Sequence, residues 1–151
     1  MIKHRGFKYL IILCLILILL PLFYSNEEIS LIIIGYPDNL FQKIFSIAIT
    51  LFGIMYIYDR LNELYLMKDY IIIRNKSIYF KICILKLIQS VFIYYMLLIL
   101  MLLIFNGLSY LIFIYALIYL ILFILQIILN DKTFNIIYIF FVFIILKILL
   151  L

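Results

Sequence analysis

The stretch LIQSVFIYYMLLILMLLIFNGLSYLIFIYALIYLILFILQIIL, residues Leu87–Leu129, decides the fold class of this chain. It holds 43 residues without one Asp, Glu, Lys or Arg. A helix needs about 20 apolar residues to cross the roughly 30 Å hydrocarbon core of a bilayer, so the run is long enough for two crossings. Asn106-Gly107 is a turn signal. It predicts a helical hairpin with helices at Leu87–Phe105 and Leu108–Leu129.

The whole chain shares this apolar composition. Of its 151 residues, 71% are hydrophobic and 13% are charged, whereas soluble domains are about 45–50% apolar and about 25% charged. So little polar surface cannot cover a soluble globule. The sequence predicts an all-α, polytopic integral membrane helix bundle that forms one domain, residues 1–151. We expect it in the cytoplasmic membrane of a bacterium, in contact with membrane lipid.

Five apolar runs predict about five transmembrane helices. The predicted spans are Phe7–Tyr24, Leu40–Tyr58, Leu87–Phe105, Leu108–Leu129 and Phe134–Leu151. Pro21 is expected to kink or loosen the last turn of the first span. Ile29–Tyr36 is too short to cross, so we place it at the interface or folded back on the bundle. The N-terminal segment resembles a signal peptide but lacks a small-residue cleavage site, which favours an uncleaved anchor.

The positive charges predict an N-in, C-out orientation. Ten of the 12 Lys and Arg residues fall in the inner segments: Lys3, Arg5 and Lys8 near the N-terminus, six in residues 59–86, and Lys132. The outer segments carry Glu27, Glu28 and Asp38 instead. The net charge of +5 is therefore explained by orientation against the bilayer, and we expect no nucleic-acid partner.

Patterns for catalysis are missing from the sequence. The single histidine, His4, lies in a basic tail, and Cys14 and Cys83 have no ligand spacing around them. The chain has no phosphate-binding loop and no protease motif. We expect no enzyme activity, no cofactor and no metal site.

The second predicted span carries a seam of small residues. Ser46, Thr50 and Gly53 recur at i, i+4 and i+7, so they share one helix face. Small residues let helix backbones approach closely in membranes. The seam predicts either packing within the chain or a homo- or hetero-oligomer through the second helix. Tyr115 and Tyr119 likewise share a face of the fourth span, as bundle packing or a ligand site.

The segment 59–86 interrupts the apolar runs with half of the chain's Lys and Arg residues. Leu61 and Leu64 share a face there, which is typical of an amphipathic interfacial helix. Ser77 is a good N-cap for a helix that begins at Ile78. We expect a helix, an elbow and a second helix at the inner face. The segment is either a solvated loop that sets topology or a surface that another protein contacts. The candidate contact residues are Arg60, Glu63, Tyr70, Ile72, Arg74, Lys76 and Ser77.

Part of this segment, YIIIRNKSIYFKICILKLI at residues 70–88, resembles the membrane subunits of ABC-type exporters of the second permease class. The resemblance covers about residues 40–105 and is carried by Arg74, Ser77, Tyr79, Phe80 and Lys86. It implies a cytoplasmic coupling helix that sits on a separate cytosolic ATPase. Such permeases commonly have six spans and an outer re-entrant element before the last; this sequence predicts five spans and no such element.

Two functions follow as expectations. The first is a non-catalytic, permease-like membrane subunit of an ABC-type export system. The alternative is a small accessory, immunity or regulatory membrane protein without transport activity of its own.

Overall fold

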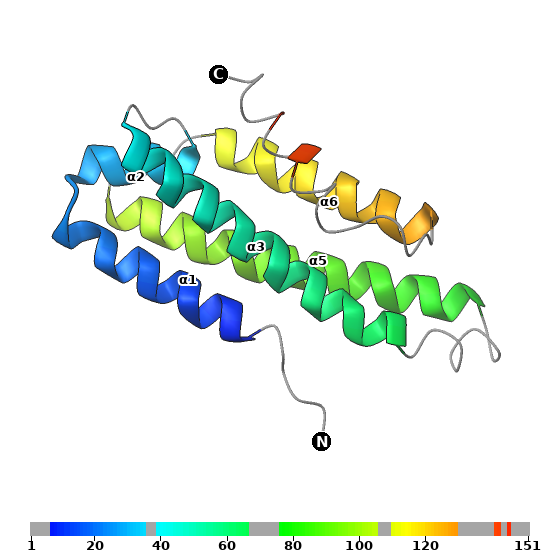
Figure 1. The fold of residues 1–151 in the computed structure, drawn as a ribbon. Coiled ribbons are helices and arrows are strands. Elements are labelled where there is room, and N and C mark those ends of the chain that lie inside the picture. The colour runs from blue at the N-terminus through cyan, green and yellow to red at the C-terminus, as the bar shows by residue number, and fades with distance from the viewer. Residues whose placement is uncertain are drawn as a thin grey trace.

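A computed structural model of the chain (Figure 1) describes residues 7–35, 39–66, 76–105 and 110–129, together with positions 141, 142 and 145. All regular structure in these residues is helical, so the predicted all-α class is confirmed for them. The helices are α1 (Phe7–Leu19), the 3-10 turn η1 (Leu20–Leu22), α2 (Asn26–Ile34), α3 (Leu40–Leu66), α5 (Lys76–Ile104) and α6 (Leu111–Leu129).

Helices α3 and α5 form the centre of the bundle. They pack against each other in opposite directions, with α1 against α3 and α6 against α5 (Figure 1). The short α2 contacts both α3 and α5 at the end where α3 begins. We call this end the α2 end. The opposite end, where α5 begins and α3 stops, is called the basic end; α1 begins on the side that faces it, short of the ends of the two central helices (Figure 1).

Local sequence explains the turn between α1 and α3. Pro21 lacks a backbone N–H, and the α-helix gives way to η1 around it, as predicted. Ser25 caps α2 in a reciprocal capping box with Glu28. Gly35 ends α2 with φ 102°, a left-handed conformation that favours glycine. Ile29, Ile32 and Ile33 are buried, so α2 is folded back on the bundle.

The boundaries of the central helices differ from the predicted ones. Helix α3 continues through Tyr58-Asp59 to Leu66, and no separate interfacial helix begins there. Helix α5 begins at Lys76, so Ser77 lies in its first turn instead of preceding it. A helix ends where backbone signals such as Gly or Pro occur, and residues 59–66 contain neither. The charged residues ended the apolar run without ending the helix.

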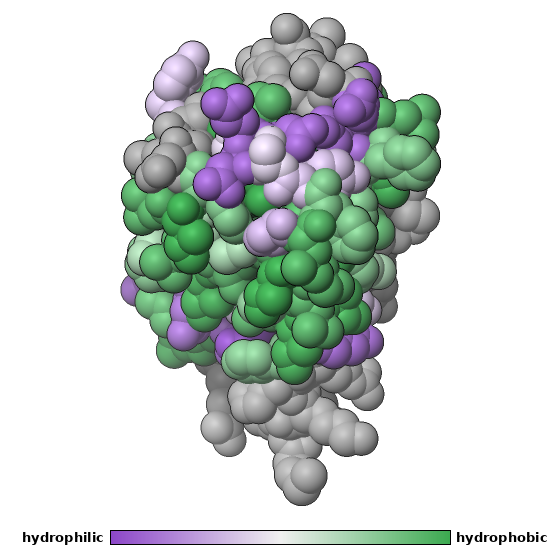
Figure 2. Space-filling view, turned by 90° about the vertical axis from the view of Figure 1, so that its left-hand side faces the viewer, coloured by the Kyte–Doolittle hydropathy of each residue, from purple (hydrophilic) through white to green (hydrophobic). Residues whose placement is uncertain are grey.

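Two helices in the described residues are long and apolar enough to cross a membrane. The candidate spans are Leu40–Asn62 in α3 and Ile78–Ile104 in α5, while the apolar helices Phe7–Leu22 and Leu111–Leu125 are shorter. Figure 2 looks at the α2 end. Hydrophilic residues gather in its upper part, a few more lie near its lower edge, and hydrophobic residues cover most of the described surface between them. The predicted fifth span, residues 134–151, lies outside the described residues except at 141, 142 and 145.

Candidate functional site: the polar face of α3

Helix α3 presents a line of polar or small residues to the interior of the bundle. We call it the α3 polar face: Gln42, Ser46, Thr50, Gly53 and Arg60, all buried. Their spacings of 4, 8, 11 and 18 residues from Gln42 keep them on one side of the helix. At 1.5 Å per residue the line is about 27 Å long, close to the roughly 30 Å of bilayer hydrocarbon. A seam of polar and small residues therefore runs through a core made mostly of aliphatic and aromatic side chains.

At its centre, tyrosines from two other helices reach the α3 backbone. The Tyr94 hydroxyl on α5 donates to the Ile49 carbonyl at 3.2 Å. The Tyr119 hydroxyl on α6 donates to the Thr50 carbonyl, also at 3.2 Å. Tyr94 lies directly over Gly53, where a Cβ would come within 2.6 Å of its hydroxyl oxygen. The absence of a side chain at Gly53 is what lets α5 approach α3 here.

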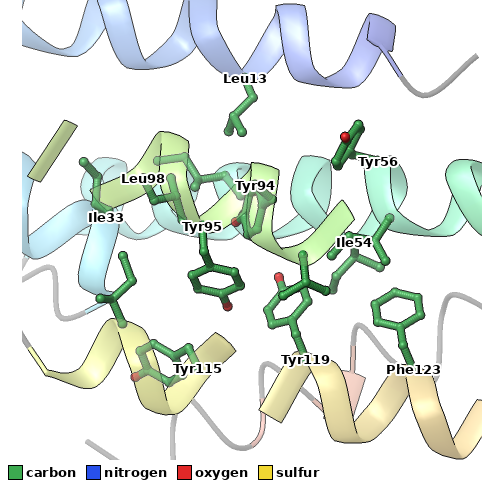
Figure 3. Packing of buried hydrophobic residues seen from close by; sticks show 14 of the residues in the cluster. Leu13, Ile33, Ile54, Tyr56, Tyr94, Tyr95, Leu98, Tyr115, Tyr119 and Phe123 are labelled. Atoms are coloured by element: carbon green, nitrogen blue, oxygen red, sulfur yellow. The ribbon is translucent and has the colours of Figure 1, made fainter. Parts of the chain in front are cut away.

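Four tyrosines line a small cavity beside these hydrogen bonds (Figure 3). They are Tyr94 and Tyr95 on α5 and Tyr115 and Tyr119 on α6. The Tyr95 and Tyr119 rings meet edge to face at 5.5 Å, and the Tyr94 and Tyr119 centroids lie 5.9 Å apart. The cavity measures about 10 Å³, which is room for about one water molecule. The sequence placed Tyr115 with Tyr119, but nothing in it indicated that Tyr94 and Tyr95 would face them.

The α2 end of the polar face is joined to the capping box. The Gln42 amide donates to Glu28 Oε1 at 2.9 Å, so α2 is fixed to the first turn of α3. Glu28 Oε2 accepts from the Ser25 backbone N–H at 2.9 Å and from its hydroxyl at 3.0 Å. These bonds from Ser25, with a smaller contribution from Gln42, hold the pKa of Glu28 below its usual value.

At the basic end the polar face finishes in a buried cation. Arg60 is 8% exposed. Its guanidinium carbon lies 5.8 Å from the centroid of the Phe7 ring, so α1 covers it. The Tyr56 hydroxyl, one turn earlier on α3, is within hydrogen-bonding reach. The sequence offered Arg60 as part of an exposed contact surface, and in the structure it is instead an interior residue.

The other predicted contact residues are placed only in part. Glu63 belongs to the last turns of α3, and Lys76 and Ser77 to the first turn of α5. Tyr70, Ile72 and Arg74 lie outside the described residues. The seam residues Ser46, Thr50 and Gly53 are covered by the chain's own helices. An oligomer through the second helix would therefore use another face of α3.

The described residues contain no group of three or more His, Cys, Asp or Glu that could hold a metal ion. Cys14 and Cys83 are free thiols. The chain matches no protein-family model, no curated protein and no solved structure.

Proposed function

We propose that the chain is a polytopic protein of the bacterial cytoplasmic membrane, with about five spans in an N-in, C-out orientation. We further propose that it is a non-catalytic, permease-like subunit of an ABC-type export system and couples to a separate cytosolic ATPase. The observation that carries the proposal is the length of the hairpin that α3 and α5 form.

Both helices are longer than a bilayer requires. Helix α3 has 27 residues and α5 has 29, or about 40 and 43 Å at 1.5 Å per residue. The hydrocarbon core accounts for roughly 30 Å. Asp59 and Asn62 lie in the last turns of α3, so the excess length belongs outside the hydrocarbon and not to tilt within it.

The excess is at the basic end, where Lys81 is exposed on α5. Positive charge alone is sufficient to set topology. A helical hairpin that extends about 10 Å beyond the hydrocarbon also supplies a rigid surface for a cytosolic protein. The resemblance of residues 70–88 to the coupling segment of ABC permeases supports an ATPase as that protein.

One observation favours the second candidate, an accessory, immunity or regulatory membrane protein without transport of its own. The cavity among the buried tyrosines has room for about one water molecule, which is too small for a transported peptide or lipid. A permease subunit would have to open between α5 and α6, or share its path with a second subunit.

The test is co-purification with a co-expressed candidate ATPase in mild detergent. The double variant Tyr70→Ala with Ile72→Ala removes apolar surface without changing charge, and we expect it to lower ATPase recovery at least fivefold. The matched control is Leu85→Ala with Ile88→Ala, an apolar pair that is exposed on the span portion of α5. The control should keep wild-type recovery, and membrane insertion should be normal in both.

A third variant separates charge from geometry. Arg74→Lys with Lys76→Arg keeps the charge, and therefore the topology, but moves the guanidinium. Lower ATPase recovery with unchanged insertion would support a specific contact. Equal recovery from wild type and the Tyr70/Ile72 variant, or no ATPase recovered with the wild type, would favour the accessory protein.

A further inference from the structure

Arg60 is a buried cation, and no described acidic side chain forms an ion pair with it; the side chain of Glu63, three residues along α3, is not among those described. The Nε of Arg60 is buried without a hydrogen-bond partner. The Phe7 ring and the Tyr56 hydroxyl next to it carry no negative charge. Burying a charge is costly unless it is paired and hydrogen-bonded. The site is therefore suited to an anionic ligand.

Two lysines lie at the same level of the bundle. Gly53 on α3 faces Tyr94 on the antiparallel helix α5. Seven residues after Gly53 is Arg60, and seven residues before Tyr94 is Leu87, so Arg60 lies level with Leu87 and its neighbour Lys86. On α1, the Phe7 ring beside Arg60 is followed directly by Lys8, which is exposed. Lys8, Arg60 and Lys86 thus occupy similar levels along α1, α3 and α5, and the Lys8 ammonium lies 4.5 Å from the centroid of the Tyr9 ring.

The depth of this level matches the phosphate groups of a bilayer. Arg60 is two residues from the end of the candidate span Leu40–Asn62, about 3 Å along the helix. Beside Lys86, the surface of α5 exposes Leu85 and Ile88. Acyl chains would cover such apolar surface, whereas a free phosphate ion would leave it in contact with lipid or water.

We propose that Arg60, with Lys8 and Lys86, binds the phosphate group of an anionic glycerophospholipid of the inner leaflet. A guanidinium offers two parallel N–H donors to two phosphate oxygens, which an ammonium group does not. Basic pockets between helices on the cytoplasmic side are a recurrent site for such headgroups. The lipid would join α1 to α3 and α5 at this end. The inference rests on the membrane placement proposed above and not on coupling to an ATPase.

The experiment measures lipid binding to the purified full chain in detergent, by native mass spectrometry and by the midpoint of thermal unfolding. The ligands are phosphatidylglycerol, phosphatidylcholine and inorganic phosphate. We expect phosphatidylglycerol to bind at least tenfold more tightly than phosphatidylcholine, and inorganic phosphate at millimolar concentration to leave the midpoint unchanged. Arg60→Gln should bring the two lipids within about twofold of each other.

Three further variants keep the result interpretable if Arg60→Gln does not fold. Lys8→Gln changes an exposed side chain and should weaken phosphatidylglycerol binding about fivefold. Arg60→Lys keeps the charge but loses the forked donor pair, and should weaken it at least threefold. Lys43→Gln is the matched control, because Lys43 is an exposed cation at the other end of α3; binding should stay within twofold of wild type.

Several outcomes would overturn the proposal. Equal affinity for the two lipids would remove the anionic preference. If the Lys8 and Arg60 variants lose no more phosphatidylglycerol affinity than the Lys43 variant, the lipid is held by non-specific attraction to positive charge. Stabilisation by inorganic phosphate equal to that by phosphatidylglycerol would indicate a site for a free anion. Release of the wild-type chain from membranes by alkaline carbonate would instead contradict the membrane placement itself.

Discussion

The Tyr119 hydroxyl on α6 donates a hydrogen bond to the backbone carbonyl of Thr50 on α3, 69 residues away in the chain, at 3.2 Å. Tyr94 on α5 makes the same kind of bond to Ile49. Lipid is as apolar as the side chains of these helices, so apolar burial alone gives them little reason to associate in a membrane. Directional bonds to the middle of α3 help to define which faces meet.

We predict that Tyr119→Phe lowers the free energy of unfolding by about 0.6–1.5 kcal/mol, the range measured for interhelical and ordinary hydrogen bonds. The effect is modest because the ring stays in place and the Thr50 carbonyl keeps its place in the helix ladder. Denaturation in mixed micelles measures it. Tyr110→Phe, at an exposed position, is the control and should change stability by less than 0.5 kcal/mol. Equal effects of the two variants would show that the Tyr119 bond contributes nothing.

Gly53→Leu should lower the free energy of unfolding by about 1–3 kcal/mol in total, because an overpacked side chain forces its neighbours to move. Tyr94 covers Gly53 and is itself buried between Tyr95 and Tyr119, so it has little room to shift. Its bond to Ile49 would be lost as well. Unfolding in detergent should detect the loss.

The control for this change is Ala48→Leu, which adds the same side chain on the opposite side of α3, at a half-buried position. It should lower the free energy of unfolding by less than a third as much as Gly53→Leu does. If the two variants lower the free energy of unfolding by similar amounts, the small-residue seam of α3 is not a close helix contact.

Within the described residues, the sequence predicted the positions of the helices well, because apolar runs and turn residues leave a local signal. The turn at Pro21, the folded-back segment before Gly35 and the start of α3 at Leu40 could all be predicted from such signals. The ends of α3 and α5 could not, because hydropathy reports where an apolar run ends and not where the helix ends. The apolar run of the second predicted span ends at Tyr58, and helix α3 continues to Leu66.

The residues that pack against the small-residue seam of α3 could not be predicted from the sequence either. The small size and the spacing of Ser46, Thr50 and Gly53 predict a close helix contact, but the pattern does not indicate which helix makes that contact. Tyr94 and Tyr119 fill that role through packing between segments far apart in the chain. For Arg60 the sequence was misleading. Its charge indicated a surface residue, but in the structure it is buried and lies against the Phe7 ring of α1.

The capping box of α2 predicts a dependence of stability on acid. Because hydrogen bonds from Ser25 lower the pKa of Glu28 in the folded state, ionised Glu28 stabilises the fold. That stabilisation is complete above the unfolded pKa of about 4.3 and is lost as the pH falls through the lowered folded value. Wild type should therefore lose more stability than Glu28→Gln between pH 6 and pH 3.

Glu27→Gln is the matched control, since it removes a neighbouring acid and leaves the capping box intact. It should follow the wild-type pH profile of unfolding midpoints. If Glu28→Gln also follows that profile, the carboxylate of Glu28 does not contribute to folding at α2.

The orientation of the bundle is the last prediction, and it rests on the separation of charge between the two ends. The α2 end carries Glu27 and Glu28 with the cation Lys43, whereas Lys8 in the first turn of α1 and Lys81 near the start of α5 lie toward the basic end. Positively charged segments are retained on the cytoplasmic side during insertion. The α2 end should therefore face outward, and the α3–α5 hairpin should project into the cytoplasm.

Single cysteines in a background without Cys14 and Cys83 test this in intact cells with a membrane-impermeant maleimide. Cysteine at Asn26 or Asn39, both exposed at the α2 end, should react from outside. Cysteine at Lys81, exposed at the start of α5, should react only after the membrane is permeabilised. Asn75 adjoins the first turn of α5 and should behave as Lys81 does. Reaction at position 75 or 81 from outside would reverse the topology. It would also place the lipid site at Arg60 in the outer leaflet and remove the hairpin from the reach of a cytosolic ATPase.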